Sequence, residues 1–122
     1  MARVLVLNVQ NNEFHTAECS ELSDFYRELG CDIFDIARRV VGDKAYDIFV
    51  DDMGLWKENP VVSAIDKNCN PMLVGNLIFA NHDEQGNTTS LTDEDMARIL
   101  SHAVHVITKN RPDGYQAVVC EY

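Results

Sequence analysis

The sequence predicts a single α+β domain in which a mainly antiparallel sheet packs against two helices. The chain has 122 residues, a common length for one domain, and 46% of them are hydrophobic. Two segments have the apolar spacing of amphipathic helices, and the rest alternates short β-branched runs with turn residues. Short connections between those runs favour antiparallel pairing over a doubly wound sheet. We therefore treat residues 1–122 as one domain.

The N-terminal segment predicts a strand that is followed by a turn. Ala2–Val9 consists mostly of apolar and β-branched residues, which is typical of a strand. The polar residues Gln10–Asn12 predict the turn. For Phe14–Glu18 the pattern fits either a second strand or a segment that crosses the surface.

The first helix is expected to begin after Ser20, the predicted N-cap, and to end at Gly30. Its apolar residues fall at i, i+3, i+4 and i+7 and so share one face: Leu22, Phe25, Tyr26 and Leu29. This spacing predicts an amphipathic helix that lies on a sheet.

A hairpin is predicted next, with strands at Cys31–Val41 and Tyr46–Val50 and a turn at Gly42–Lys44. A second turn is expected at Asp51–Gly54. Residues 57–71 contain two prolines and several asparagines and predict a loop, with a short helical turn at Val61–Ile65.

Leu73–Ala80 is predicted to form one internal strand. Gly75 and Asn76 lie in the middle of this run. A glycine inside a strand marks a bulge or a close approach to the backbone. Asn81–Thr89 is then expected to form a polar loop around Gly86.

The second helix has several start signals. Thr92 is the predicted N-cap, and Asp95 stands three residues later, as in a capping box. Leu91 and Met96 are spaced to form a hydrophobic staple across the cap. The helix is expected to stop near His102, although a longer helix also fits the pattern.

The C-terminal segment predicts two more strands joined by a turn. Ala103–Thr108 is rich in β-branched residues, Arg111–Gly114 has turn residues, and Tyr115–Glu121 predicts the last strand.

The chain carries a formal net charge of −10, with 20 acidic and 10 basic residues. This balance disfavours duplex nucleic acid and anionic membranes as partners, since both need a positive field. No apolar run is long enough to cross a bilayer, and the N-terminus lacks the pattern of a signal peptide. We therefore expect a cytoplasmic protein with reduced thiols, because no pair of its four cysteines has CxxC spacing.

The sequence gives no positive signal for catalysis or metal binding. It contains no nucleophile elbow, phosphate-binding loop or dinucleotide fingerprint, and its four histidines lack zinc-ligand spacing. The expectation is a protein that is not an enzyme and has no cofactor and no metal.

A binding site is instead expected between the internal strand and the second helix. Hydroxyl and amide side chains precede a helix N-terminus there, which is a favourable place for an anion. Phe79 could stack on a base, and nearby cations could neutralise phosphates. The candidate ligand-binding residues are Asn76, Phe79, Asn87, Thr88, Thr89, Ser90, Arg98, Lys109 and Arg111. The same residues are also ordinary capping, loop and core residues, and this structural interpretation stays open.

Three motifs carry a resemblance to a known group of proteins: Asp51-Asp52-Met53-Gly54-Leu55, Leu73-Val74-Gly75-Asn76-Leu77-Ile78-Phe79 and Thr89-Ser90-Leu91-Thr92-Asp93-Glu94-Asp95. The chain resembles a small phage and mobile-element domain. It is also similar to the phage anti-defence sponge proteins that counter Thoeris immunity. The resemblance covers most of the chain, from the first strand through the second helix.

The resemblance implies a protein that captures a cyclic nucleotide signal in an infected bacterial cell without cleaving it. The implied ligands are glycocyclic ADP-ribose and, in some members, cyclic oligonucleotides, and the implied state is a dimer or higher homo-oligomer. It places a stacking aromatic at Phe79, polar partners at Asn87–Ser90 and phosphate contacts at Arg111 and Lys109. Two alternatives remain: an acidic protein-interaction module or DNA mimic, and a small nucleotide-processing enzyme.

Overall fold

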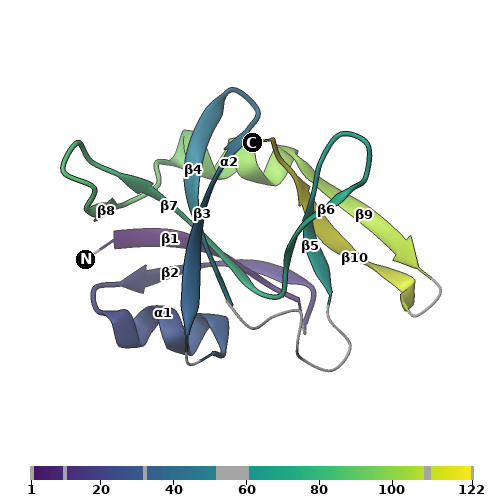
Figure 1. Cartoon of the computed structure of the whole chain (residues 1–122), viewed down its shortest axis with the longest axis horizontal. Coiled ribbons are helices and arrows are strands. Elements are labelled where there is room, and N and C mark those ends of the chain that lie inside the picture. The colour runs from purple at the N-terminus through teal and green to yellow at the C-terminus, as the bar shows by residue number, and fades with distance from the viewer. Residues whose placement is uncertain (1, 10, 32, 52–60, 109–110, 122) are drawn as a thin grey trace.

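The computed structural model describes residues 2–9, 11–31, 33–51, 61–108 and 111–121, without the side chains of Thr108 and Arg111. Two sheets and two helices make up this part of the chain (Figure 1). The larger sheet lies on the left of Figure 1 and the smaller one on the right, with α1 at the bottom left. The α+β class predicted from the sequence is confirmed.

The larger sheet has the strand order β2-β1-β7-β4-β3, and the short β8 pairs with β7. Every pairing in it is antiparallel. Its strands are β1 (Ala2–Asn8), β2 (Glu13–Cys19), β3 (Phe34–Val41), β4 (Lys44–Asp51), β7 (Leu77–His82) and β8 (Thr88–Thr89). The second-strand interpretation of residues 14–18 is thus confirmed, and so is the hairpin around the turn at Gly42 and Asp43.

The smaller sheet has the strand order β6-β5-β10-β9. Its strands are β5 (Val62–Ile65), β6 (Pro71–Val74), β9 (Ala103–Thr108) and β10 (Arg111–Val119). The pairing of β5 with β10 is parallel, and the other two pairings are antiparallel. The prediction of a mainly antiparallel arrangement is therefore correct for both sheets.

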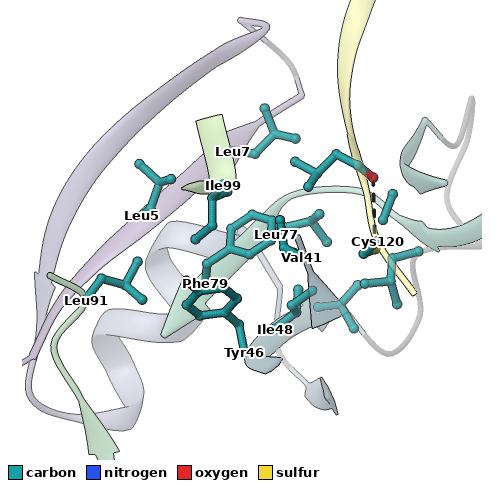
Figure 2. Close-up of a cluster of buried hydrophobic side chains, with 14 of the residues drawn as sticks. Leu5, Leu7, Val41, Tyr46, Ile48, Leu77, Phe79, Leu91, Ile99 and Cys120 are labelled. Carbon is teal, nitrogen blue, oxygen red and sulfur yellow. Dashed lines mark hydrogen bonds between the residues drawn. The ribbon is translucent and has the colours of Figure 1, made fainter. Parts of the chain in front are cut away.

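Each face of the larger sheet has its own hydrophobic core, because successive strand residues point to opposite faces. On β1, Leu5 and Leu7 belong to one cluster, while Val4 and Val6 belong to the other. The first cluster lies between the larger sheet, α2 and the smaller sheet (Figure 2). The second cluster lies under α1. Full burial of one such side chain contributes about 1.5–3 kcal/mol.

The two helices begin and end almost where the sequence predicts. The first, α1 (Leu22–Leu29), ends at Gly30 in the left-handed conformation, but its N-cap is Glu21 and not Ser20. The backbone N–H of Ser20 instead bonds the Asp24 carboxylate at 2.9 Å. The second helix, α2 (Asp93–Ser101), has the predicted capping box and ends with His102 as its C-cap.

Two predicted elements in the middle of the chain are wrong. Leu73–Ala80 is not one strand, because Gly75, at a φ of +88°, ends β6 and lets the chain enter the other sheet as β7. That backbone conformation suits glycine, so the residue marks a change of sheet and not a bulge. Val61–Ile65 forms strand β5 instead of a helical turn, since pairing with β6 and β10 outweighs the local signal. Residues 52–54 of the predicted turn and residues 57–60 of the predicted loop lie outside the described residues.

Candidate ligand-binding site

Several predicted ligand residues hold the fold together instead of facing a common pocket. Asn76 accepts a hydrogen bond from the backbone N–H of Val9 at 2.9 Å, and its amide lies 3.4 Å from the carbonyl of Leu29. It therefore joins the end of β1 to the end of α1. This role accounts for the asparagine after Gly75 without a ligand.

Phe79 is fully buried in the first core cluster, with 0% of its surface exposed. Figure 2 shows its ring among Tyr46, Ile48 and Ile99. A ring in this position cannot stack on a base, so the ligand-stacking role predicted for Phe79 is wrong for this conformation. The apolar alternation of β7 explains the placement, since Ile78 points into the other core.

The segment before α2 is also largely occupied by structural bonds. Asn87 closes the turn after β7, where its backbone N–H and its side-chain amide both donate to the Asp83 carboxylate. The hydroxyl of Ser90 accepts from the backbone N–H of Arg3 at 2.8 Å. Thr89 pairs with Asn81 through the β7–β8 ladder. Thr88 is exposed and lies opposite His82.

Arg98 is engaged at every nitrogen of its guanidinium. Its Nε lies 3.1 Å from Asp43, Nη1 donates to Tyr46 and Asp95, and Nη2 reaches Glu94 at 3.3 Å. A phosphate could bind Arg98 only by displacing these partners. The other two predicted cations, Lys109 and the side chain of Arg111, lie outside the described residues.

The other face of the larger sheet is only partly covered by its helix. Phe25 and Leu29 of α1 pack over Phe49 and Ile78, and the rings of Phe25 and Phe49 stack at 4.5 Å. Towards the start of β4 the sheet surface is open to solvent, since Ala45 is exposed, and His82 at the end of β7 is partly exposed. The uncovered section is therefore lined by strand side chains.

Four polar residues gather on this uncovered section, and we call them the open patch: Arg38, Asp47, His82 and Thr88. Arg38 lies opposite Asp47 in the β3–β4 ladder, and His82 lies opposite Thr88 in the β7–β8 ladder. The β4–β7 pairing of Asp47 with Ala80 brings the two pairs together. Asp47 Oδ1 accepts from Arg38 Nε at 3.2 Å, and its Oδ2 lies 3.3 Å from His82 Nδ1.

Burial differs sharply within the open patch. Asp47 is 7% exposed, so its charge needs compensation from neighbouring cations or donors. The side chains of Arg38 and His82 are 60% and 31% exposed. His82 Nδ1 is itself buried and lacks an aligned hydrogen bond, although Asp47 is close. Asp47 thus orients two cation-forming side chains whose outer atoms face solvent.

The geometry leaves hydrogen-bond donors free on the outer side of the patch. Arg38 uses Nε for Asp47, and its two terminal nitrogens form no bond to any residue that the structure describes. His82 Nε2 is likewise unbonded within the described ranges. Terminal guanidinium nitrogens suit a phosphate or carboxylate, which they can bind in bidentate fashion. The exposed end of Arg38 can therefore hold an anion.

The sequence prediction included Thr88 but missed Arg38, Asp47 and His82. A sequence profile described as "Domain of unknown function (DUF3846)" matches residues 1–103. The chain belongs to the DUF3846 family. No curated protein and no solved structure matches it.

The DUF3846 match contains the whole larger sheet and both helices, and it ends at the first residue of β9. All four residues of the open patch therefore lie within the DUF3846 region, whereas β10 follows it. The family description names no activity, ligand or partner. Within the described ranges, no helix of this DUF3846 chain is long and apolar enough to span a membrane.

Proposed function

We propose that this protein binds an anionic small ligand of the cyclic nucleotide type at the open patch and holds it without cleaving it. In this role it would sequester a cyclic nucleotide immune signal, such as glycocyclic ADP-ribose, in the cytoplasm of an infected bacterial cell. The observation that carries the proposal is the Arg38 guanidinium, which Asp47 anchors through Nε while the Arg38 side chain stays 60% exposed, with His82 on the other oxygen of the same carboxylate.

The contacts and the burial of the Asp47 carboxylate support binding without turnover. Each of its carboxylate oxygens lies beside a cation-forming side chain, and the carboxylate is nearly buried. A carboxylate in this position stabilises the charge of its neighbours and is poorly placed to act as a base on a bound ligand. The motif resemblance described above supports the nucleotide class of the ligand.

Thermal melting against a panel of cyclic and linear nucleotides tests the proposal. A ligand at a hundredfold excess over its Kd stabilises the native state by about 2.7 kcal/mol, which shifts the melting temperature by several degrees. The expected result is a clear shift with a cyclic nucleotide that is recovered intact by mass after denaturation. Recovery of a changed nucleotide would contradict sequestration and favour an enzyme.

Two pairs of variants locate the site. Arg38→Met is expected to weaken binding at least about tenfold, because a charge-assisted bidentate contact is lost. Arg27→Met is the matched control, since Arg27 is 63% exposed and also pairs with an aspartate. Thr88→Val leaves the Arg38–Asp47 pair intact and is compared with Thr16→Val, another exposed strand threonine. Equal losses in a variant and its control would mean that binding does not occur at the open patch.

The net charge of −10 favours a second function, an acidic interaction module that binds a basic protein. A flat nucleotide panel would support this alternative. The complex with such a partner would weaken steeply as salt is added, because exposed charges are screened.

A further inference from the structure

The two sheets end in four edge strands, and edge strands carry unpaired backbone N–H and C=O groups. These are β2 and β3 in the larger sheet and β6 and β9 in the smaller one, as far as the structure describes them. Such an edge can pair with another chain unless charge, proline, shortness or a covering segment prevents it. The four edges differ in this protection.

Three of the edges are protected. Strand β2 carries Glu13 and Glu18, and β3 carries several charged residues and a bridge from Val40 to Glu121. Strand β6 has only four residues and begins with Pro71. Charge and proline both oppose pairing with an added strand.

Strand β9 has none of the protecting charges and no proline. Its sequence, Ala-Val-His-Val-Ile-Thr, contains no acidic residue, no lysine or arginine and no proline. Val104 is 37% exposed and Ile107 is 67% exposed. The ring of its histidine, His105, lies against the backbone of Gly114, where no space remains for a Cβ. Strand β9 is therefore an apolar, largely accessible edge.

We propose that β9 pairs in antiparallel fashion with β9 of a second copy of this chain. Charge favours a second copy as the partner. A chain with a net charge of −10 repels its own copy, so self-association requires a surface without acidic groups. A basic protein would find no carboxylate on β9, whereas β9 itself is an uncharged strand of matching length. Main-chain hydrogen bonds supply the attraction in this mode of recognition.

Two-fold symmetry makes the pairing self-complementary. A two-fold axis perpendicular to the sheet keeps every side chain on its own face, so residues of the same face meet across the axis. Val104 and Val106 share one face, where they lie opposite Ala117 and Tyr115 of β10. The valines of the two copies would therefore extend one apolar surface across the new junction.

The pairing would leave the open patch free. Figure 1 shows β9 at the right end of the molecule, while β8 and the adjoining end of β7 lie at the left. The pairing is thus independent of ligand binding, and each copy would keep its own open patch accessible.

Sedimentation equilibrium on wild type and variants tests the interface. Wild type is expected to be dimeric at about 100 µM, and Ile107→Lys and Val104→Lys are expected to weaken the dimer at least about tenfold. Ile33→Lys is the matched control, because Ile33 is 58% exposed outside β9. Added salt should tighten the dimer by screening the repulsion between the copies. A monomeric wild type, or an equal effect of Ile33→Lys, would overturn the proposal.

Hydrogen exchange on the wild-type protein gives a readout that does not depend on how the variants fold. Amides of β9 should exchange more slowly at high protein concentration than after a dilution of about a hundredfold, because the dimer dissociates on dilution. Amides of β6, the other edge of the same sheet, should show no such change. Protection of β9 that is independent of concentration would contradict the pairing.

Discussion

The two helices begin with the same local arrangement but use it at different depths. In each, the third helical residue is an aspartate whose carboxylate accepts from the backbone N–H of the N-cap: Asp24 from Glu21 and Asp95 from Thr92. The other bonds of Asp24 reach only Ser20 and Arg27, which are close in sequence. The side chain of Asp24 is 20% exposed, whereas that of Asp95 is 2% exposed.

Asp95 binds residues from two strands in addition to its own helix. Its Oδ1 accepts from Lys44 and Tyr46 of β4, each at 2.8 Å. Its Oδ2 accepts from Asn81 of β7, also at 2.8 Å. Arg98, one turn further along α2, adds a bond to the same carboxylate. The capping residue of α2 thus fastens the helix to the larger sheet.

The pKa values follow from these surroundings. Burial raises the pKa of Asp95, but hydrogen bonds from Lys44, the Thr92 backbone and Asn81 outweigh it, so the pKa lies well below its ordinary value of 3.8. Burial raises the pKa of Tyr46 to about 12, which keeps its hydroxyl protonated as a donor. Backbone hydrogen bonds from Ser20 and Glu21 lower the pKa of Asp24. The same cap motif therefore stabilises α2 more than α1, because buried charges interact more strongly.

Replacing Asp95 should have the largest effect. Asp95→Ala removes the carboxylate that compensates Lys44 and Arg98 and leaves the buried Tyr46 hydroxyl without its acceptor. Breaking a buried ion pair from one side costs about 3–5 kcal/mol. We expect a loss near the lower limit, about 3 kcal/mol, because Lys44 is 43% exposed and can regain water. Urea unfolding would measure it as a fall in the denaturation midpoint.

Asp93→Ala provides the control within the same helix. Asp93 also lies in the first turn of α2, but its side chain is 96% exposed. Its loss should change stability by at most about 0.5 kcal/mol. If both variants lost the same stability, the contribution of Asp95 would come from the helix terminus alone. The network with β4 and β7 would then add nothing to the free energy of unfolding.

Acid should weaken the Asp95 network next. Because the pKa of Asp95 is lower in the folded state than its ordinary value of 3.8, its contribution is present above that value and is lost as the pH falls through the folded-state pKa. Unfolding free energies measured between about pH 5 and about pH 2 should therefore fall more steeply for wild type than for Asp95→Asn.

Other carboxylates contribute to the acid dependence of both proteins. Asp66 and Asp83 have lowered pKa values through hydrogen bonds from Asn70 and Asn87, respectively, and both remain in the variant. The difference between the two curves isolates Asp95. Parallel curves would show that its carboxylate is not the group that the network stabilises.

The sequence predicts the local capping contacts of the two aspartates but not the long-range contacts of Asp95. The Thr92–Asp95 box is visible because both residues lie within one helical turn. The partners Lys44, Tyr46 and Asn81 are distant in sequence and meet Asp95 only once β4 and β7 are neighbours. Antiparallel pairing is likewise predicted from short connections, whereas the change of sheet at Gly75 depends on tertiary pairing.

The candidate site likewise has one part that the sequence can predict and one part that it cannot. The two-residue turn at Gly42 and Asp43 fixes the β3–β4 register, and that register places Arg38 opposite Asp47. This pair could have been found from the sequence by counting back from the turn. His82 could not, because it joins the pair only through the β4–β7 ladder. The sequence does not separate a ligand role for Phe79 from a core role, because an aromatic in a strand fits a core as well as a surface.

The smallest of these effects is expected for the cap of α1, whose aspartate is less deeply buried than Asp95. Asp24→Ala removes the capping box of α1 together with the ion pair to Arg27, but water can replace every one of these partners. The fall in melting temperature should therefore be only a fraction of that caused by Asp95→Ala, and Ser23→Ala, an exposed change in the same turn, should have almost no effect. Calorimetry on the three variants measures the order. An Asp24→Ala variant as unstable as Asp95→Ala would mean that the cap itself, and not burial, decides how much such an aspartate contributes.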